Sequence, residues 1–471
     1  MQGMTMIDLP VVQTPQNGTQ TAGDADITTA TGGRTLYVET YGCQMNLNDS
    51  EIVQSIMNKN GYAIVDGPDD ADVILLNTCA IRDNAERRIH ERLKHLRYYK
   101  KRKNDLVVGV LGCMAERLRT RLLEDEKLVD LVIGPDEYRK TPQLVDSAFS
   151  GEKGLAVKLS RVETYDDITP LRTEGISAWV SIMRGCDKFC TFCVVPWTRG
   201  RERSRSLDGI VAETRGLWEN GFREMTLLGQ NVNSYRDEDK GADFSDLLAA
   251  CAEAAPQMRI RYTTSHPYDM SDKLIETMAA YDNICKYIHL PVQSGSDRVL
   301  QLMNRKYTVE HYLERMQAIK KAMPHCALST DIICGFPTET EEDHQLTMEL
   351  MAQVRYDGAF MFKYSPRERT RAWKMGDDIP DDVKTRRLNE VIEQQQNISR
   401  EINQAAIGTT ERVLVEGPSK RNAAEWQGRT DSNKVVIFPH NEHSGYIVGD
   451  TIEVAVERST SATLFGSIVN S

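Results

Sequence analysis

Three cysteines lie within eight consecutive residues near the middle of the chain: Cys186, Cys190 and Cys193. Three residues separate the first pair and two separate the second, so one tight loop can direct three thiols toward a single metal cluster. Three ligands leave one iron of a four-iron cube without a protein ligand, and that iron can bind a small molecule. The spacing therefore predicts a catalytic iron–sulfur cluster. The alternatives are a disulfide, or a zinc clip that lacks a fourth ligand nearby.

A second set of cysteines, Cys43, Cys79 and Cys113, follows three predicted strands of the N-terminal region. The predicted strands span residues 35–40, 73–77 and 106–111. Helical patterns at 48–60 and 83–100 separate them, and this alternation is typical of a parallel sheet covered by helices. The carboxyl ends of parallel strands meet at one edge of a sheet, so we expect the three thiols to converge and to hold a second cluster. The alternative is that all three are ordinary buried apolar residues.

The central region contains six predicted strands, each followed by a helical pattern or a polar turn. They span residues 179–183, 225–228, 259–263, 287–290, 327–333 and 358–362. Six strand–helix units are too few to close an eight-stranded barrel, so we expect an open (β/α)6 partial barrel. Polar residues follow these strands, including Gln230, Asn231 and Ser294, and residues at such strand ends usually form the site.

The last part of the chain changes from helical to strand periodicity. A long helix is predicted over 378–406, and five short strands follow it at 411–416, 426–430, 435–438, 451–456 and 463–468. Five short strands in such a small region indicate a small closed β-barrel. The predicted organisation is therefore α/β multidomain: a flexible tail over 1–33, a parallel-sheet α/β domain over 34–150, the partial barrel over 172–404 and an all-β barrel over 405–471.

The chain carries a formal net charge of −11, yet its basic residues are clustered. One cluster lies between residues 87 and 103, and a second comprises Arg199, Arg201, Arg203 and Arg205. Local basic surface on an acidic protein is typical of a selective RNA binder, although each run could instead be a solvated helix face. Ten cysteines in a long chain with no apolar run of membrane-spanning length and no signal pattern predict a soluble, cytoplasmic metalloprotein.

The pattern Cys-x3-Cys-x-Phe-Cys, with Phe192 as its aromatic residue, resembles the signature of radical S-adenosylmethionine enzymes. The flanking sequences Arg-Gly-Cys at 184–186 and Pro-Trp-Thr-Arg-Gly at 196–200 are similar to the methylthiotransferase branch, and within it to the MiaB type, which modifies tRNA. Three N-terminal motifs, at 41–46, 77–80 and 112–116, also resemble this family and surround its auxiliary-cluster cysteines. The likeness extends over nearly the whole chain after the first thirty or so residues.

The resemblance implies two [4Fe-4S] clusters, S-adenosylmethionine as cofactor, a radical-S-adenosylmethionine partial barrel and a C-terminal TRAM-like RNA-binding barrel. It also implies the reaction, in which C2–H of an isopentenyladenosine beside the tRNA anticodon becomes C2–SCH3. One S-adenosylmethionine would be the radical source and a second the methyl donor. The residues that would contact S-adenosylmethionine are Phe192, Gln230, Asn231 and Ser294, although the two-glycine-and-glutamate motif of many relatives is absent.

We expect three partners: tRNA through its anticodon stem-loop, a flavodoxin-like electron donor and a protein that delivers sulfur or clusters. The candidate RNA contacts are Arg199, Arg201, Lys420, Arg421, Trp426, Arg429 and Lys434. Four further cysteines, Cys251, Cys285, Cys326 and Cys334, have no ligand spacing and are expected in the core.

Three alternative functions remain open. One is methylthiolation of an aspartate in a ribosomal protein, and another is methylthiolation of threonylcarbamoyl adenosine in tRNA. The third belongs to a different class, an iron–sulfur RNA-binding redox sensor. The motifs at 44–46 and 82–86 resemble the isopentenyladenosine branch more than the other methylthiotransferases, and a sensor would need only one exposed cluster.

Overall fold

The computed structural model describes residues 33–79, 83–172, 175–419, 422, 424–440 and 445–469. The chain divides into two compact units. The first comprises the chain up to residue 174 together with Trp179–Asp187 and Val194–Gly209, and the second comprises Gly175–Ala178, Lys188–Cys193 and Ile210 onward. The predicted tail over 1–33 lies outside the described residues except for Gly33. No helix in the described ranges has the length and apolar character needed to cross a bilayer.

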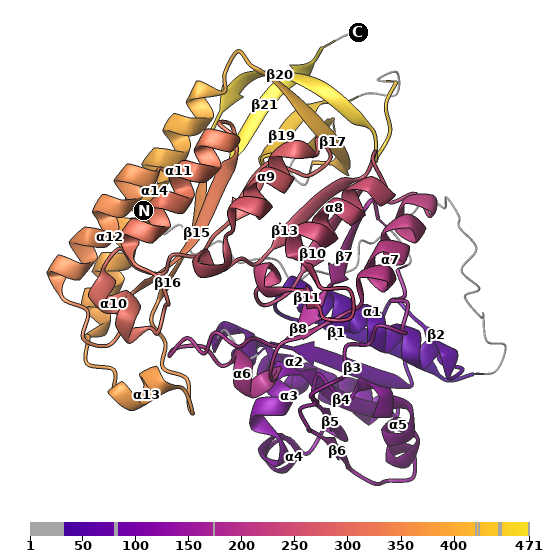
Figure 1. Cartoon of the computed structure of the whole chain (residues 1–471). Helices are drawn as coiled ribbons and strands as arrows, with labels where there is room; N and C mark the ends of the chain where they lie inside the picture. The colour runs from indigo at the N-terminus through magenta and orange to yellow at the C-terminus, as the bar shows by residue number, and fades with distance from the viewer. Residues whose placement is uncertain are drawn as a thin grey trace. The chain divides into compact units, whose positions relative to one another are not determined.

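The first unit is built on a parallel sheet, as expected, and the sheet has six strands (Figure 1). Its order is β2 (Ala63–Ile64), β1 (Thr35–Thr40), β3 (Val73–Thr78), β4 (Val107–Gly112), β5 (Leu131–Ile133) and β6 (Gly154–Ala156). Strands β3 and β4 are buried along their whole length, which explains their continuous apolar sequences. The sequence did not predict β2, β5 or β6, and β6 lies between the predicted N-terminal domain, which ends at 150, and the predicted partial barrel, which begins at 172.

Helices cover both faces of this sheet and enclose two apolar clusters. They are α1 (Gln44–Lys59), α2 (Asp83–Arg102), α3 (Cys113–Leu118), α4 (Thr120–Asp125) and α5 (Thr141–Phe149), with short 3-10 turns at Pro68–Asp70 and Tyr138–Lys140. Residues of α1 and α5 contribute to one cluster, and residues of α2, α3 and α4 contribute to the other. A later segment also belongs to this unit: β8 (Met183–Arg184), α6 (Val195–Thr198) and β9 (Arg203–Ser204), in which β8 and β9 pair in antiparallel fashion.

Six strands of the central region form two three-stranded sheets. The first three in the chain form one sheet, and the last three form the other. One sheet has the order β13 (Arg259–Thr263), β10 (Glu224–Leu228) and β7 (Ser177–Ser181), and the other has the order β14 (Tyr287–His289), β15 (Ala327–Cys334) and β16 (Gly358–Lys363). A single parallel bridge between Ile260 and Ile284 joins the region of β13 to the segment before β14. Among the described strands, only those of the C-terminal domain close into a barrel, so the central sheets have the open form that the sequence predicts.

Helices follow the central strands and give the strand–helix alternation seen in Figure 1. They are α7 (Leu207–Glu219), α8 (Phe244–Ala254), α9 (Asp272–Ala280), α10 (Asp297–Leu302), α11 (Val309–Ala322), α12 (Glu341–Val354), α13 (Arg371–Met375) and α14 (Asp381–Ala405). Minor elements are β11 (Arg236–Asp237), β12 (Ala242–Asp243) and 3-10 turns at Val232–Ser234 and Pro267–Asp269. Helices α12 and α14 run side by side, and α14 packs on β16.

The C-terminal domain is a closed barrel of five strands, with both antiparallel and parallel pairings. The strand order is β17 (Thr410–Pro418), β18 (Glu425–Thr430), β19 (Val435–Pro439), β21 (Thr463–Ile468) and β20 (Thr451–Ser459). Its core is a compact apolar cluster that includes Val413, Val436, Phe438 and Val454. Arginines of β13 fasten the barrel to the central sheet: Arg259 donates to the carbonyl of Arg429 at 2.8 Å, and Arg261 donates to that of Thr430 at 2.6 Å.

Candidate iron–sulfur sites

The three N-terminal cysteines lie at the carboxyl ends of adjacent strands. Strands β1, β3 and β4 are neighbours in the sheet, and their register pairs Thr40 with Asn77 and Thr78 with Gly112. Cys79 directly follows β3, Cys113 directly follows β4, and Cys43 follows β1 after a two-residue turn. The structure therefore brings all three thiols to one edge of the sheet, where parallel α/β sheets bind ligands.

Glycines precede two of these cysteines and allow the close approach of their loops. Gly42 has φ +121°, and a Cβ atom on it would lie only 2.4 Å from the Cβ of Cys79. Gly112 has φ +90°, and its Cβ would lie 2.5 Å from Oδ1 of Asn77. Any side chain at either position would be both strained and obstructed, so glycine is required for the cysteine loops to meet.

The thiols of this group influence one another. A hydrogen bond with Cys79 is the main reason that the pKa of Cys43 falls to about 6, and the positive charge of Arg199 lowers it further against the effect of burial. Burial raises the pKa of the Cys113 thiol, and Arg199 opposes that increase. The thiolate is the form that binds a metal, so this environment favours ligation.

Arg199 lies inside this site. Its Nε donates to Sγ of Cys113 at 3.2 Å, and its Nη2 donates to Oδ1 of Asn46 at 2.9 Å and to Oδ2 of Asp49 at 2.7 Å. Only 3% of the residue is exposed. The expectation that Arg199 contacts RNA is therefore not supported, because a polynucleotide cannot reach a side chain enclosed between a thiol and a carboxylate.

Most of the other arginines of the cluster at 199–205 are buried as well. Arg203 donates to Asp136 at 2.9 Å and Arg205 donates to Asp166 at 2.7 Å, and both arginines are buried. Only Arg201 is exposed, and it pairs with Asp187. The arginine cluster at 199–205, which was predicted to be basic surface, therefore consists largely of internal ion pairs. These pairs depend on tertiary contacts that no local sequence pattern predicts.

The three cysteines of the central loop are each partly exposed. In the first unit, the backbone N–H of Cys186 donates to the carbonyl of Gly200 at 3.2 Å. In the second unit, the N–H of Cys193 donates to the carbonyl of Cys190 at 3.0 Å, and Sγ of Cys190 accepts a hydrogen bond from Nη1 of Arg305 at 3.2 Å. The loop therefore leaves its sulfurs accessible while its backbone is held.

Arg305 and the residue before it anchor the central loop within the second unit. Nη2 of Arg305 donates to the carbonyl of Pro291 at 2.7 Å, and its Nε donates to the hydroxyl of Tyr307 at 3.0 Å. Nδ2 of Asn304 donates to the carbonyl of Phe189 at 3.0 Å. Arg305 could not be predicted from a local sequence pattern, because its contact with Cys190 joins residues far apart in the chain.

The four residues expected to contact S-adenosylmethionine lie in different environments. Phe192 packs beside the apolar cluster of Val299, Met303 and Phe336 and is only partly buried. Ser294 is buried, and its hydroxyl accepts from the N–H of Ser296 at 3.2 Å, which gives it a role in the turn before α10.

Gln230 and Asn231 belong to a group of polar residues at the ends of β10 and β13 whose buried atoms lack partners among the described residues. The atoms are Oε1 of Gln230, Oδ1 of Asn231, Oγ of Ser265 and Nε2 of His266. Buried polar atoms are normally hydrogen-bonded, so this concentration is what an absent polar ligand would leave. Ser265 and His266 were not among the site residues predicted from the sequence.

Nδ2 of Asn231 connects this group to the cysteine loop. It donates to Asp269 at 2.7 Å, and Asp269 also pairs with Nζ of Lys188 at 2.7 Å. Lys188 lies between Cys186 and Cys190 in the sequence.

No three His, Cys, Asp or Glu side chains in the described ranges are arranged around a point that could hold a single metal ion. Cysteines of a four-iron cube each bind a different iron, so their sulfurs lie farther apart than the ligands of one ion. The N-terminal site has three thiols at one sheet edge and a buried arginine beside one of them. These donor groups are suitable for binding such a cube.

Three regions of the chain match known families. Residues 35–134 match the uncharacterized protein family UPF0004, residues 180–351 match the radical SAM superfamily, and residues 404–469 match the TRAM domain. A tRNA-2-methylthio-N(6)-dimethylallyladenosine synthase of Chloroherpeton thalassium is 55% identical over 92% of this chain and 95% of its own length. The chain belongs to this synthase family. Another member, from Bacteroides thetaiotaomicron, is 52% identical over 95% of this chain and 99% of its own length.

Solved structures show the same fold at low sequence identity. The radical S-adenosylmethionine methyltransferase TsrM of Kitasatospora setae, with cobalamin and a [4Fe-4S] cluster bound, aligns with a TM-score of 0.55 at 13% identity and covers 81% of this chain and 77% of its own. The cobalamin-dependent radical enzyme OxsB aligns with a TM-score of 0.51 at 13% identity and covers 76% of this chain and 56% of its own. These similarities show the architecture alone.

Within the TRAM domain, the residues expected to contact RNA are partly engaged in the fold. Trp426 stacks on His440 with ring centroids 3.7 Å apart, Arg429 pairs with Glu416 at 2.8 Å, and Lys434 pairs with Asp357 at 3.1 Å. Lys420 and Arg421 lie outside the described residues.

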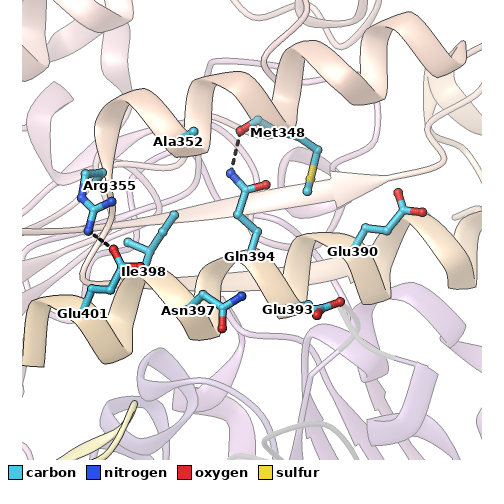
Figure 2. A pocket seen from close by; sticks show the side chains of 9 residues that line it. All are labelled: Met348, Ala352, Arg355, Glu390, Glu393, Gln394, Asn397, Ile398 and Glu401. Atoms are coloured by element: carbon cyan, nitrogen blue, oxygen red, sulfur yellow. Dashed lines mark hydrogen bonds and ion pairs between the residues drawn. The ribbon is translucent and has the colours of Figure 1, made fainter. Parts of the chain in front are cut away.

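A groove lies between α12 and α14 (Figure 2). Figure 2 shows glutamates along α14 facing the groove, and Arg355 pairs with Glu401 at 2.6 Å across it. None of the cysteines discussed above lines it.

Proposed function

We propose that this protein replaces the C2 hydrogen of N6-dimethylallyladenosine in tRNA with a methylthio group by radical S-adenosylmethionine chemistry. The observation that carries the proposal is the identity of 55% and 52% to two synthases of that name over almost the whole length of each chain. The match includes all three family regions, and the six cysteines lie in two of them.

We assign the six cysteines to two [4Fe-4S] clusters. Cys186, Cys190 and Cys193 would hold the radical cluster, because their spacing suits one loop around a cube with an open iron. The auxiliary cluster would be held by Cys43, Cys79 and Cys113 at the shared edge of β1, β3 and β4. When bound, the two clusters and S-adenosylmethionine supply the electron, the radical source, the sulfur and the methyl group of the reaction.

The polar group at the ends of β10 and β13 supports binding of S-adenosylmethionine in the second unit. That cofactor carries amino, carboxylate and ribose hydroxyl groups. These groups can form hydrogen bonds with the buried atoms that lack a partner in Gln230, Asn231, Ser265 and His266. Burial, with Arg305 and Lys188 nearby, lowers the pKa of His266 to about 2, so its imidazole is neutral. Its Nδ1 accepts from the N–H of Tyr268 at 3.3 Å, which places the ring proton on Nε2, and Nε2 can donate one hydrogen bond. Phe192 and Ser294 remain candidates for the same cofactor.

The residues of the chain provide binding and order while the bound groups provide the reactivity. Gly42 and Gly112 let the cysteine loops approach, and Arg305 fixes the Cys190 sulfur against the wall of the second unit. The TRAM domain supports binding of tRNA. Candidate phosphate contacts are Arg201 in the first unit, and Lys420 and Arg421, which lie outside the described residues. A flavodoxin-like electron donor and a protein that delivers sulfur or clusters complete the proposal.

The synthase relatives favour the dimethylallyladenosine substrate over the other methylthiotransferase substrates. A redox sensor would not explain two cysteine triads together with a partial barrel. We therefore retain the tRNA activity as the single proposed function.

The proposal is tested by mass spectrometry of tRNA nucleosides from cells that lack their own synthase and express this chain. Wild type should convert dimethylallyladenosine to its 2-methylthio form. Cys190→Ala and Cys79→Ala should each leave the nucleoside unconverted, whereas Cys251→Ser, at a buried cysteine outside both triads, is the matched control. The proposed function is wrong if wild type leaves dimethylallyladenosine unchanged while another nucleoside, or a ribosomal protein, gains a methylthio group.

A further inference from the structure

The ion pairs beneath the N-terminal cysteines contain more positive than negative charge. Three arginines, Arg184, Arg199 and Arg203, are enclosed with two carboxylates, Asp49 and Asp136, and each of the five side chains is at most 4% exposed. Asp49 pairs with Arg184 at 2.8 Å and with Arg199 at 2.7 Å, and Asp136 pairs with Arg203 at 2.9 Å. Two carboxylates cannot neutralise three guanidinium groups.

An excess buried cation is costly unless an anion compensates it. Arg199 shares its carboxylate with Arg184, so it is the arginine that most needs a further anion. Its Nε points to Sγ of Cys113 at 3.2 Å, and its Nη1 is buried without a partner among the described residues. A thiolate at Cys113, made more negative by an attached iron–sulfur cluster, is the anion that the arrangement is built to receive.

Arg199 is rigidly placed for this contact. Its backbone N–H donates to the carbonyl of Val195 at 2.8 Å at the end of α6, and its Nη2 is held by Asn46 and Asp49. Both of those residues belong to α1, whose N-terminal end follows Cys43. The guanidinium therefore cannot turn away from Cys113 without breaking buried hydrogen bonds on its other edge.

We propose that Arg199 is a positioning residue of the auxiliary site, which hydrogen-bonds the Cys113 thiolate and holds the reduction potential of its cluster above the value it would have without that charge. The inference rests on the proposed function, because it assumes that Cys113 is a cluster ligand. Hydrogen bonds to ligand sulfurs and nearby positive charge both stabilise the reduced, more negative cluster. Arg199 supplies both at once.

The experiment isolates the auxiliary cluster in the full-length chain. The background variant carries Cys186→Ala, Cys190→Ala and Cys193→Ala, so that only the N-terminal triad can bind iron. After anaerobic reconstitution, iron content and the electron paramagnetic resonance signal are measured during a redox titration. Arg199→Gln is compared with Arg199→Lys in this background.

We expect Arg199→Gln to shift the midpoint potential to a more negative value with iron content unchanged. Arg199→Lys retains the charge but not the planar donor, so it should restore part of the shift. The matched control is Arg203→Gln, which removes a buried arginine from the same segment whose described partners are Ser160, Asp136 and the Arg199 carbonyl rather than a cysteine sulfur. Its shift should be smaller than that of Arg199→Gln.

The outcomes separate this inference from the proposed function. If the background variant binds no iron, the assignment of the N-terminal cysteines, and with it the proposed function, is wrong. If it binds iron but Arg199→Gln and Arg199→Lys both titrate at the parent potential, the function stands and the role of Arg199 is refuted. If Arg199→Gln does not fold, Arg199→Lys still decides the matter, since loss of the planar donor alone should lower the potential.

Discussion

At the scale of single residues, one cysteine in each candidate site accepts a hydrogen bond from a buried arginine. Arg199 donates to Cys113 and Arg305 donates to Cys190, both at 3.2 Å. The sequence predicts all six cysteines as candidate ligands from their spacing, because ligand spacing within a loop and the strand–helix period are local patterns. It could not identify either arginine, because each meets its cysteine only through the fold, and Arg199 was misplaced on an RNA-binding surface.

Replacing Gly42 by alanine should disturb the N-terminal site through backbone strain and direct obstruction by Cys79. The positive φ alone costs about 1–3 kcal/mol in stability, and the added Cβ at 2.4 Å from that of Cys79 forces the loop to move. We expect a lower melting temperature and about half of the iron of wild type after reconstitution. The matched control is Gly61→Ala, since Gly61 has φ +87° but nothing within 4 Å of its Cβ position. Equal iron in Gly42→Ala and wild type would contradict the close approach.

The buried carboxyl of Glu116 should make stability depend on pH. Burial raises its pKa to about 7, although Arg119 opposes the increase. The folded state therefore keeps this proton up to about pH 7 while the unfolded chain releases it near pH 4.5, so this group's contribution to stability falls as pH rises between these values. Glu116→Gln mimics the protonated form and should melt higher than wild type at pH 8 but not at pH 4.5. A difference that grows toward pH 4.5 would reverse the assigned sign.

At the scale of elements, sequence periodicity predicted the long strands and helices and missed the short ones. β1, β13 and β21 have the predicted bounds, and the long helix before the barrel is α14. β2, β5 and β6 have only two or three residues each, which is too few for an alternating pattern to emerge. Their positions depend on pairing with the neighbouring strands of the sheet, which is information that a single segment does not contain.

The attachment of the C-terminal barrel should depend on Arg261 of β13. This buried side chain donates to the carbonyls of Thr430 and Asp431 and pairs with Glu224 at 2.8 Å. Arg261→Ala would leave these groups without a donor and should lower the free energy of unfolding by about 3 kcal/mol, measured by urea denaturation. Arg412→Ala, at an exposed position of β17, is the control and should change it by less than about 0.5 kcal/mol. Equal effects of the two changes would contradict the docking role.

At the scale of the whole molecule, the three predicted folded regions correspond to the three family matches. The N-terminal and C-terminal regions were predicted from strand patterns, and the central region from its six strand–helix units. The overall net charge of −11 is a poor guide to nucleic acid binding on its own. It sums over internal ion pairs such as those of Arg184 and Arg203, which contribute nothing to the surface that a tRNA would meet.

The central claim is that the six cysteines form two independent cluster sites, and iron counting with Mössbauer spectroscopy on the full-length chain tests it most directly. Reconstituted wild type should hold about eight irons, all in [4Fe-4S] clusters. The variant with alanine at Cys43, Cys79 and Cys113, and the variant with alanine at Cys186, Cys190 and Cys193, should each hold about four. Wild type with only four irons, or either triple variant with as much iron as wild type, would contradict the account.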